Sequence, residues 1–221
     1  MKLVICIPGN NFSGSFFDSF LEFYHWCLHN NINVFLSRKE SCNIYYVRNM
    51  CLGGNVQAGK SQKPWGGSFD YDYMLWIDSD IVFKPQDFIK LLQMEKDIAS
   101  GLYLMTNGSR EPNQFATVVD WDEKFFEKNG YFKFVQREDV VGKTEPFVAD
   151  YTGFGFILIK KGVFESLDYP WFQPIFFNIG NAHDFCMEDV GFCLKAKEKG
   201  HKVWIHPQVI VKHEKKILLS T

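Results

Sequence analysis

Short apolar runs, each closed by a polar or glycine-containing segment, recur along the first half of the chain. Residues 2–7 and 32–36 are rich in Val and Ile, which favours buried strands. Between them, apolar residues recur every three or four positions from Phe17 to Leu28, the spacing of one helix face. This alternation predicts an α/β fold, a three-layer α/β/α sandwich with a mixed, mostly parallel central sheet. Further strands are expected at 98–105, 153–159, 202–205 and 209–211, and further helices at 41–52, at 161–166, after Pro85 and after Glu188-Asp189.

Three other segments are less regular. Residues 53–72 contain five glycines and a proline and are expected to form a loop. Residues 107–152 suggest an insert with hairpin character, built from 114–119 and 131–136. Residues 168–185 are polar and aromatic and are expected to form a loop before Glu188.

Composition narrows the possible partners and compartment. The net charge of −2 offers no basic field for nucleic acid, and no run approaches the ~20 apolar residues of a membrane span. The amino terminus lacks a signal-peptide pattern, and six cysteines without a Cys-x-x-Cys pair suggest free thiols in a reducing compartment. We therefore expect a cytoplasmic protein. The chain ends shortly after His213, so it can be one domain of a longer protein.

The apolar run from Tyr73 to Ile77 ends in Asp78-Ser79-Asp80. Such a run is typical of a strand buried on both faces, and ligands of open α/β sheets bind beyond the carboxyl ends of the strands. Two aspartates separated by one residue concentrate negative charge, which a hard divalent cation can balance while it also holds phosphates. The alternative is an Asp-rich turn without a ligand.

Residues Gly54 to Ser61 match the phosphate-loop pattern G-x-x-x-x-G-K-S. That loop must leave a strand and open a helix, whereas the residues before Gly54 are predicted to be helical. Pro64 and the glycines that follow would break the helix required after the motif. We therefore expect a loop near the site with a solvated Lys60, and keep a nucleoside triphosphatase as an alternative.

Three groups can converge on the Asp78 strand. Glu188-Asp189 begins a helix, where acids can cap the helix or face a cleft. His213 follows the last strand and can complete a divalent cation site, although a lone histidine is more often structural. Arg48-Asn49 can place a guanidinium and an amide beside a nucleotide, or Arg48 can pair with a surface acid.

The ordered set of motifs resembles the GT-A glycosyltransferases over nearly the whole chain. It also resembles the glycosyltransferase domains encoded by large algal viruses. The resemblance rests on Asp78-Ser79-Asp80, Gly153-Phe154-Gly155-Phe156, residues 187–193, His206-Pro207 and His213, with support from residues 47–49 and 97–103.

The resemblance implies a metal-dependent, inverting transferase of GT-A, Rossmann-like fold. The donor would be a nucleoside diphosphate sugar, which we expect to be a UDP-sugar. The acceptor would be a glycan, a glycoprotein or another molecule with a hydroxyl group. A single domain, 1–221, would divide into a nucleotide-binding half, 1–105, and an acceptor-binding half, 106–221. Asp189 would be the base and Glu188 would contact a sugar. The metal, Mn²⁺ or Mg²⁺, would be held by Asp78, Asp80 and His213, and the nucleotide by Pro8, Gly9, Arg38, Arg48, Asp78 and Ser79.

Several alternatives stay open at this point. Ser37-Arg38 stands where many members of the family carry an acid near uracil, which leaves the base undetermined. A sugar-nucleotide or glycan binding module without turnover would use the same residues. Trp65, Tyr151 or Trp171 could stack on a sugar ring. The sugar, the acceptor, the anomeric outcome and the oligomeric state do not follow from the sequence.

Overall fold

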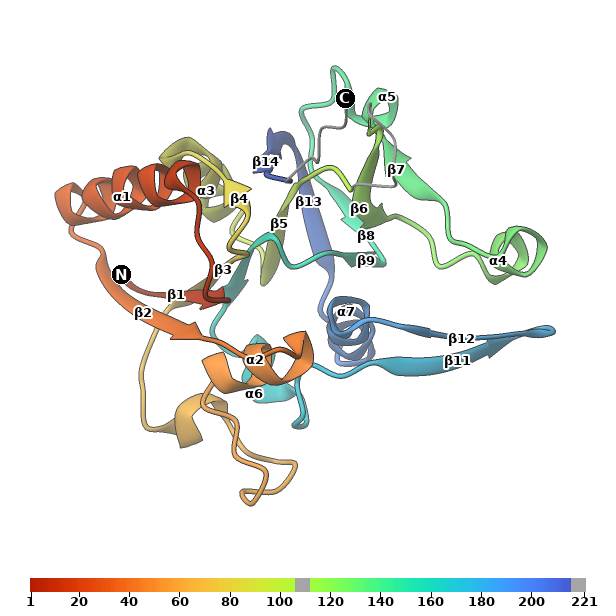
Figure 1. Ribbon diagram of the computed structural model, residues 1–221, viewed down its shortest axis with the longest axis horizontal. Helices are drawn as coiled ribbons and strands as arrows, with labels where there is room; N and C mark the ends of the chain where they lie inside the picture. The colour runs from red at the N-terminus through yellow and green to blue at the C-terminus, as the bar shows by residue number, and fades with distance from the viewer. Residues whose placement is uncertain (106–111, 216–221) are drawn as a thin grey trace, which may run out of the picture.

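A seven-stranded mixed sheet forms the centre of the protein in the computed structural model, which describes residues 1–105 and 112–215. Five strands are parallel, and β10 and β8 run against them. The predicted fold class is therefore confirmed (Figure 1). In spatial order the strands are β2 (Asn33–Lys39), β1 (Lys2–Pro8), β3 (Tyr73–Ile77), β10 (Phe156–Lys160), β5 (Ile98–Leu102), β13 (Val203–Ile210) and β8 (Phe147–Ala149).

Helices cover both faces of this sheet, because the central strands are apolar on both sides. In β3, Leu75 and Ile77 pack toward one face, while Met74 and Trp76 pack toward the other. The first face is covered by α1 (Gly14–His29) and α3 (Pro85–Gln93). The second is covered by α2 (Ile44–Cys51), α6 (Val163–Ser166) and α7 (Glu188–Glu198).

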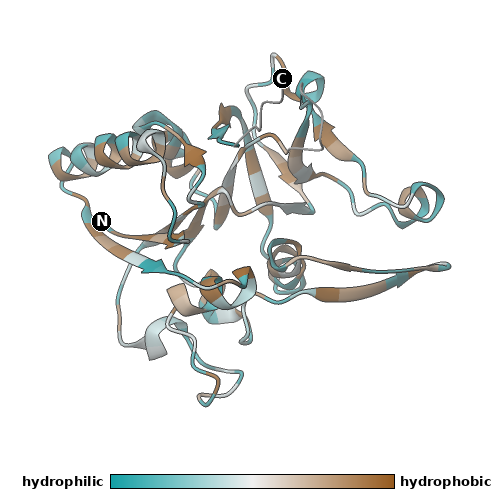
Figure 2. Ribbon diagram, in the orientation of Figure 1, coloured by the Kyte–Doolittle hydropathy of each residue, from teal (hydrophilic) through white to brown (hydrophobic). Residues whose placement is uncertain are grey.

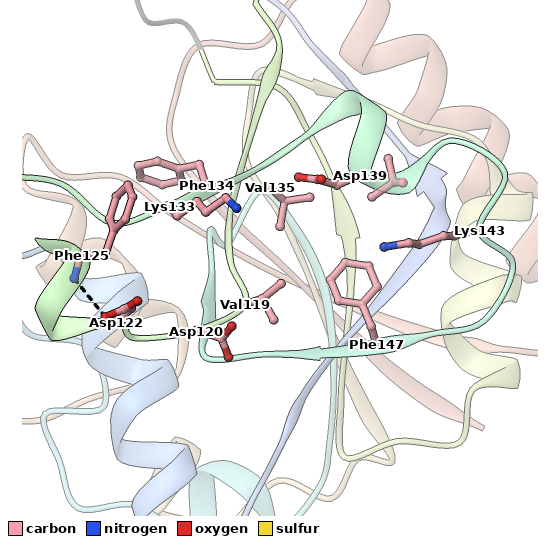
Figure 3. Close-up of a pocket in the computed structure, with 11 residues that line it drawn as sticks. Val119, Asp120, Asp122, Phe125, Lys133, Phe134, Val135, Asp139, Lys143 and Phe147 are labelled. Atoms are coloured by element: carbon pink, nitrogen blue, oxygen red, sulfur yellow. Dashed lines mark hydrogen bonds between the residues drawn. The ribbon is translucent and has the colours of Figure 1, made fainter. Parts of the chain in front are cut away.

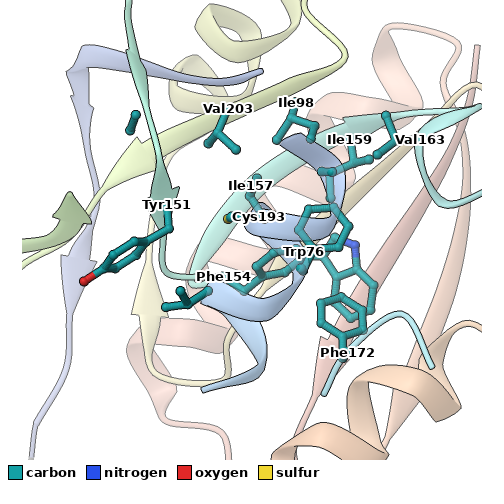
Figure 4. Packing of buried hydrophobic residues seen from close by; sticks show 14 of the residues in the cluster. Trp76, Ile98, Tyr151, Phe154, Ile157, Ile159, Val163, Phe172, Cys193 and Val203 are labelled. Atoms are coloured by element: carbon teal, nitrogen blue, oxygen red, sulfur yellow. The ribbon is translucent and has the colours of Figure 1, made fainter. Parts of the chain in front are cut away.

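Aromatic side chains fill the core on the α7 side. The Trp76 ring meets Phe154 and Phe172 edge to face, with centroids 5.6 and 5.2 Å apart, and Phe172 stacks on Phe192. Figure 4 shows Phe154 and Phe172 around Trp76, beside α7. Their packing fixes the carboxyl end of β3 against the start of α7.

Smaller elements surround the sheet. The 107–152 insert is partly confirmed, because residues 112–152 contain short strands and two short helices, α4 (Glu123–Asn129) and α5 (Arg137–Val140); residues 107–111 lie outside the described part. A 3-10 turn, η1, covers Pro64–Gly67 in the predicted 53–72 loop. The additional strands are β4 (Ile81–Val82) with β14 (Lys212–His213), β7 (Phe134–Gln136) with β6 (Gln114–Val118) and β9 (Tyr151–Thr152), and β11 (Ile175–Ile179) with β12 (Ala182–Cys186).

Two expectations from the sequence are corrected. The segment 168–185 is not a loop throughout, because β11 and β12 pair as an antiparallel hairpin around Gly180-Asn181. The two strands expected at 202–205 and 209–211 are one strand, β13, whose pairing with β5 shifts register between Ile205 and Ile210. A bulge of this kind accommodates Pro207, which has no N–H to donate to the ladder. No helix among residues 1–105 and 112–215 is long and apolar enough to span a membrane.

Candidate active site

Asp78-Ser79-Asp80 leaves the carboxyl end of β3 and is held in place by backbone pairing. The N–H of Asp78 donates to the carbonyl of Gly155, 3.0 Å away. After Asp80, β4 pairs with β14, which sets His213 opposite Ile81, and the N–H of Glu214 donates to the carbonyl of Asp80 at 2.8 Å. This short ladder brings residues 80 and 213 together.

Asp80 and His213 are in contact. Nε2 of His213 lies 3.2 Å from Oδ2 of Asp80, and Nδ1 lies 2.7 Å from the carbonyl of Leu104. The Nζ of Lys215 lies 2.6 Å from the same Asp80 oxygen. Burial by itself would raise the pKa of Asp80, but hydrogen bonds from His213 and Lys215 lower it to about 2. Asp80 is therefore a carboxylate at any ordinary pH.

The chemistry of this pair fits a divalent cation. In the neutral imidazole, the hydrogen bond that Nδ1 donates to a carbonyl leaves Nε2 without a proton, which is the usual orientation of a metal-binding histidine. Nε2 would then bind a cation in place of the hydrogen bond that it makes to Asp80 here. Two oxygen or nitrogen ligands at ~2.1 Å in octahedral geometry stand ~3 Å apart, close to the observed separation. No group of three or more His, Cys, Asp or Glu side chains within the described residues is placed to hold a metal. A cation here would therefore take its other ligands from water and substrate oxygens.

Asp78 faces Arg48 instead of the Asp80–His213 pair. Nη2 of Arg48 lies 3.0 and 3.1 Å from the two oxygens of Asp78. Nε of the same guanidinium donates to Oε1 of Glu188 at 2.9 Å. The Cζ atom of Arg48 lies 5.2 Å from the centre of the Phe154 ring and 5.9 Å from the centre of the Trp76 ring. Arg48 thus joins helix α2, the end of β3 and the start of α7.

This cation is buried, with 3 % of its surface exposed, and so is Glu188. Burial alone would lower the pKa of Arg48, but Asp78 and Glu188 outweigh it and raise the pKa above its ordinary value. The Nη1 atom of Arg48 is buried without a hydrogen-bond partner in the described structure. Glu188 directs Oε1 to Arg48, and the Asn49 amide donates to the carbonyl oxygens of Tyr45 and Phe172.

Asp189 stands beside this buried cluster as the second residue of α7. Its Oδ1 accepts from the N–H of Val190 at 2.8 Å, and the side chain is half-buried. Burial, followed by the negative charge of Glu188, raises the pKa of Asp189 to about 6. A carboxylate with such a pKa can accept a proton near neutral pH.

The four other predicted site residues lie along neighbouring strand ends. Pro8 ends β1, and the register places Lys39 of β2 beside it. Nη1 of Arg38 donates to the carbonyl of Gly9 at 3.1 Å. A Cβ on Gly9 would stand 3.0 Å from Oγ of Ser79, so the backbone passes close to the Asp78 loop.

Two residues at the site were missed by sequence reasoning. Lys215 pairs with Asp80, whereas the sequence shows only that Lys212 and Lys215 flank His213 along the chain. Tyr103 is buried and its ring meets the His213 ring edge to face at 5.1 Å. A Cβ on Gly155 would lie 2.6 Å from the Tyr103 ring, so this glycine is required by close approach.

The residues matching a phosphate loop do not form one. They leave helix α2 instead of a strand and are followed by η1 instead of an α-helix. The Lys60 side chain is 81 % exposed and lies 3.8 Å from Asp168. The strand–loop–helix frame that would direct backbone N–H groups at a triphosphate is therefore missing from this described segment.

The aromatic residues considered for sugar stacking differ in exposure. Trp171 is fully buried and Tyr151 nearly so, which places both in the core, whereas Trp65 is partly exposed. A separate cavity of about 350 Å³ lies in the second half of the chain, between Phe125, Phe134 and Phe147 (Figure 3). None of the predicted site residues lines it.

Comparison with solved structures identifies the fold. Over 98 % of this chain and 43 % of the other, the structure is similar to GalNAc-T7 in a crystal structure with UDP, GalNAc and Mn²⁺, at a TM-score of 0.56 and 13 % identity. The chain thus spans less than half of that protein. At such identity the likeness shows a GT-A-like, Rossmann-type fold.

Two other solved structures match with lower TM-scores. A197 from STIV gives a TM-score of 0.49 at 15 % identity, covering 100 % of this chain and 98 % of the other. A glycosyltransferase involved in glycosylation of the PBCV-1 major capsid gives 0.35 at 11 % identity, covering 75 % and 63 %. No protein-family model matches the sequence, and no curated protein matches it.

Proposed function

We propose that the protein is a metal-dependent glycosyltransferase that moves a sugar from a nucleoside diphosphate sugar, UDP-linked, to a hydroxyl acceptor. The observation that carries this proposal is the Asp80–His213 pair at the carboxyl edge of the sheet, with Nε2 and Oδ2 3.2 Å apart. The GT-A-like fold supports it, because open α/β sheets bind ligands at this edge.

In this proposal Asp80 and His213 hold Mn²⁺ or Mg²⁺, and Asp78 contributes through the ion's waters or the ribose. The ion, when bound, neutralises the negative charge that develops on the leaving diphosphate. Lys215 donates to Oδ2 of Asp80 in this structure, so a cation that binds there would displace it from that oxygen. Asp80 therefore has a positively charged partner in both cases, Lys215 without the metal ion and the metal ion when it is bound.

Asp189 is the proposed base of an inverting displacement. It must accept the proton of the acceptor hydroxyl from within ~3 Å, and its raised pKa suits that task near neutral pH. Arg48 and Glu188 are positioning residues that hold Asp78 and the first turn of α7 in register. The Arg48 guanidinium also lies 5.2 Å from the centre of the Phe154 ring, within the range of a cation–π contact.

The nucleotide is assigned to the first half of the chain, 1–105, and the acceptor to the second, 106–221. Pro8, Gly9, Arg38 and Ser79 would border the nucleotide. Arg38 also lines a hollow of about 540 Å³ whose walls include Phe35, Trp65 and Phe69, and these rings could stack on a base.

Asp80→Asn is expected to lower turnover of a UDP-sugar in Mn²⁺ by about 100-fold or more. Of the two residues proposed to hold the ion, Asp80 supplies the carboxylate, and the substitution removes its negative charge. The measurement is UDP release across a panel of UDP-sugars, with and without acceptor glycans. The matched control is Lys60→Ala, which should leave turnover unchanged. Nucleoside triphosphate hydrolysis that disappears in Lys60→Ala would instead identify a phosphate-loop enzyme, and tight binding without turnover would identify a binding module.

A further inference from the structure

Helix α1 carries an apolar stripe that nothing in the described structure covers. Phe17, Leu21, Tyr24 and Leu28 are 56, 46, 39 and 56 % exposed. Their spacing of four, three and four residues is that of a two-helix seam. The stripe lies about a third of a turn around α1 from the face that the helix buries against the sheet through Phe16, Ser19, Phe23 and Cys27. In Figure 1, α1 lies at the outer edge of the molecule, and Figure 2 shows apolar positions along it.

We propose that a second copy of this chain covers the stripe, by antiparallel pairing of α1 with α1 about a two-fold axis. In that arrangement Phe17 meets Leu28 of the second copy and Leu21 meets Tyr24, so each of four layers joins a leucine to an aromatic ring. A parallel pair would also be two-fold symmetric, with its axis along the helices, but each residue would then meet its own copy.

The charges that flank the stripe favour the antiparallel orientation. Asp18 follows Phe17 and His25 follows Tyr24, so both line the same edge of the stripe, one in each half of α1. Glu22 lies farther around the helix, in a hollow with Lys84 and Lys212. Antiparallel pairing sets Asp18 of each helix beside His25 of the other, where the carboxylate can accept an imidazole N–H. Parallel pairing sets this edge of one helix beside the opposite edge of the other, which carries Phe20 and Cys27. The surface is therefore complementary to itself.

The same residues argue against a lipid surface as the occupant. Helices that lie on membranes carry Lys and Arg on the polar face, and residues 14–29 contain neither. Acids beside the stripe would be repelled by anionic lipid.

The exposed area sets the expected strength. With about half of each large side chain uncovered, the stripe contributes on the order of 400 Å² per copy, near the largest apolar patch of an ordinary monomer. Together with the flanking residues this falls at the lower limit for specific interfaces, so we expect a reversible dimer with a Kd on the order of 10 µM.

The test is sedimentation equilibrium of the full chain at total concentrations from about 1 to about 200 µM, which bracket that Kd. Leu21→Lys should weaken dimerisation at least about thirtyfold, because it places a charge in a central layer. Val56→Lys, which changes an exposed residue of the 53–72 loop, should leave the dimer intact. A wild-type monomer at about 200 µM, or an unchanged dimer in Leu21→Lys with an unchanged circular dichroism spectrum, would overturn the proposal.

Orientation is tested by disulfide trapping in a Cys42→Ser background, which removes the one exposed cysteine. Mixing Leu21→Cys protein with Tyr24→Cys protein should give a cross-linked heterodimer, while each variant alone should not cross-link. Efficient cross-linking of Leu21→Cys alone would show parallel helices and contradict the model of pairing. Leu21-dependent co-sedimentation of a monomer with phosphatidylcholine–phosphatidylserine vesicles would overturn it in favour of a lipid surface.

Discussion

Arg48→Met is expected to lower the free energy of unfolding by about 3–5 kcal/mol, as removal of one partner from a buried ion pair generally does. The substitution keeps much of the side-chain volume but leaves Asp78 and Glu188 facing each other without a cation. The loss should shrink in acid, because unpaired buried carboxyls have raised pKa values and become neutral as the pH falls. Urea unfolding at neutral pH and near pH 4 measures both effects.

The matched control is Arg38→Met. Arg38 is 44 % exposed and pairs with an exposed acid, Glu40, so its loss should change stability by less than about 1 kcal/mol. The triple variant Arg48→Met/Asp78→Asn/Glu188→Gln should recover part of the stability, because no charge is then left buried alone. Equal effects of the two arginine variants would show that Arg48 does not organise the site.

Asp189→Asn is expected to lower kcat for sugar transfer by about 10²–10⁴-fold, the usual contribution of a general base. Wild-type kcat/KM should rise with pH through an apparent pKa near 6 and level off above it, since the base must be ionised. The variant should lose this rise. Initial rates of UDP release between about pH 5 and pH 8, at saturating Mn²⁺, provide the test.

The same substitution should stabilise the fold at neutral pH. The folded state raises the pKa of Asp189 from 3.8 to about 6, so it binds the proton more tightly than the unfolded chain does. Wild-type stability therefore falls as the pH rises through this window, and the neutral amide avoids that loss. A substitution that lowers activity while it raises stability is typical of a residue that serves function at the expense of stability. Asp184→Asn, at an exposed carboxylate on β12, should change neither activity nor stability. If Asp189→Asn instead lowered the stability, Asp189 would be a structural residue and not the base.

Much of the sheet could be predicted, because its strands are apolar on both faces. The runs before Pro8 and before Asp78 have no other stable location than the centre of an α/β sandwich. The β11–β12 hairpin was missed although a signal was present. Gly180-Asn181 stands between two segments of strand-forming residues, which is the pattern of a two-residue hairpin turn.

The site could be predicted only in part. The order of motifs indicated that Asp80 and His213 belong together, and the β4–β14 ladder joins them. The sequence did not indicate that Arg48 is buried between two acids, because the residues around an arginine on a helix do not show whether its side chain faces solvent or a buried cluster. Nor could it show Lys215 on Asp80, or the close approach of Tyr103 to Gly155, since both depend on how distant segments pack.

Thermal unfolding in the presence of UDP, with and without Mn²⁺, tests most directly whether the carboxyl edge of the sheet grips a diphosphate through a cation. UDP with Mn²⁺ at about 100 times its Kd should raise the Tm by about 5–10 °C. The shift should vanish when Mn²⁺ is withheld or when Asp80 is replaced by Asn, and ATP should not reproduce it. A Tm that UDP and Mn²⁺ leave unmoved, or a shift that Asp80→Asn retains, would contradict the account.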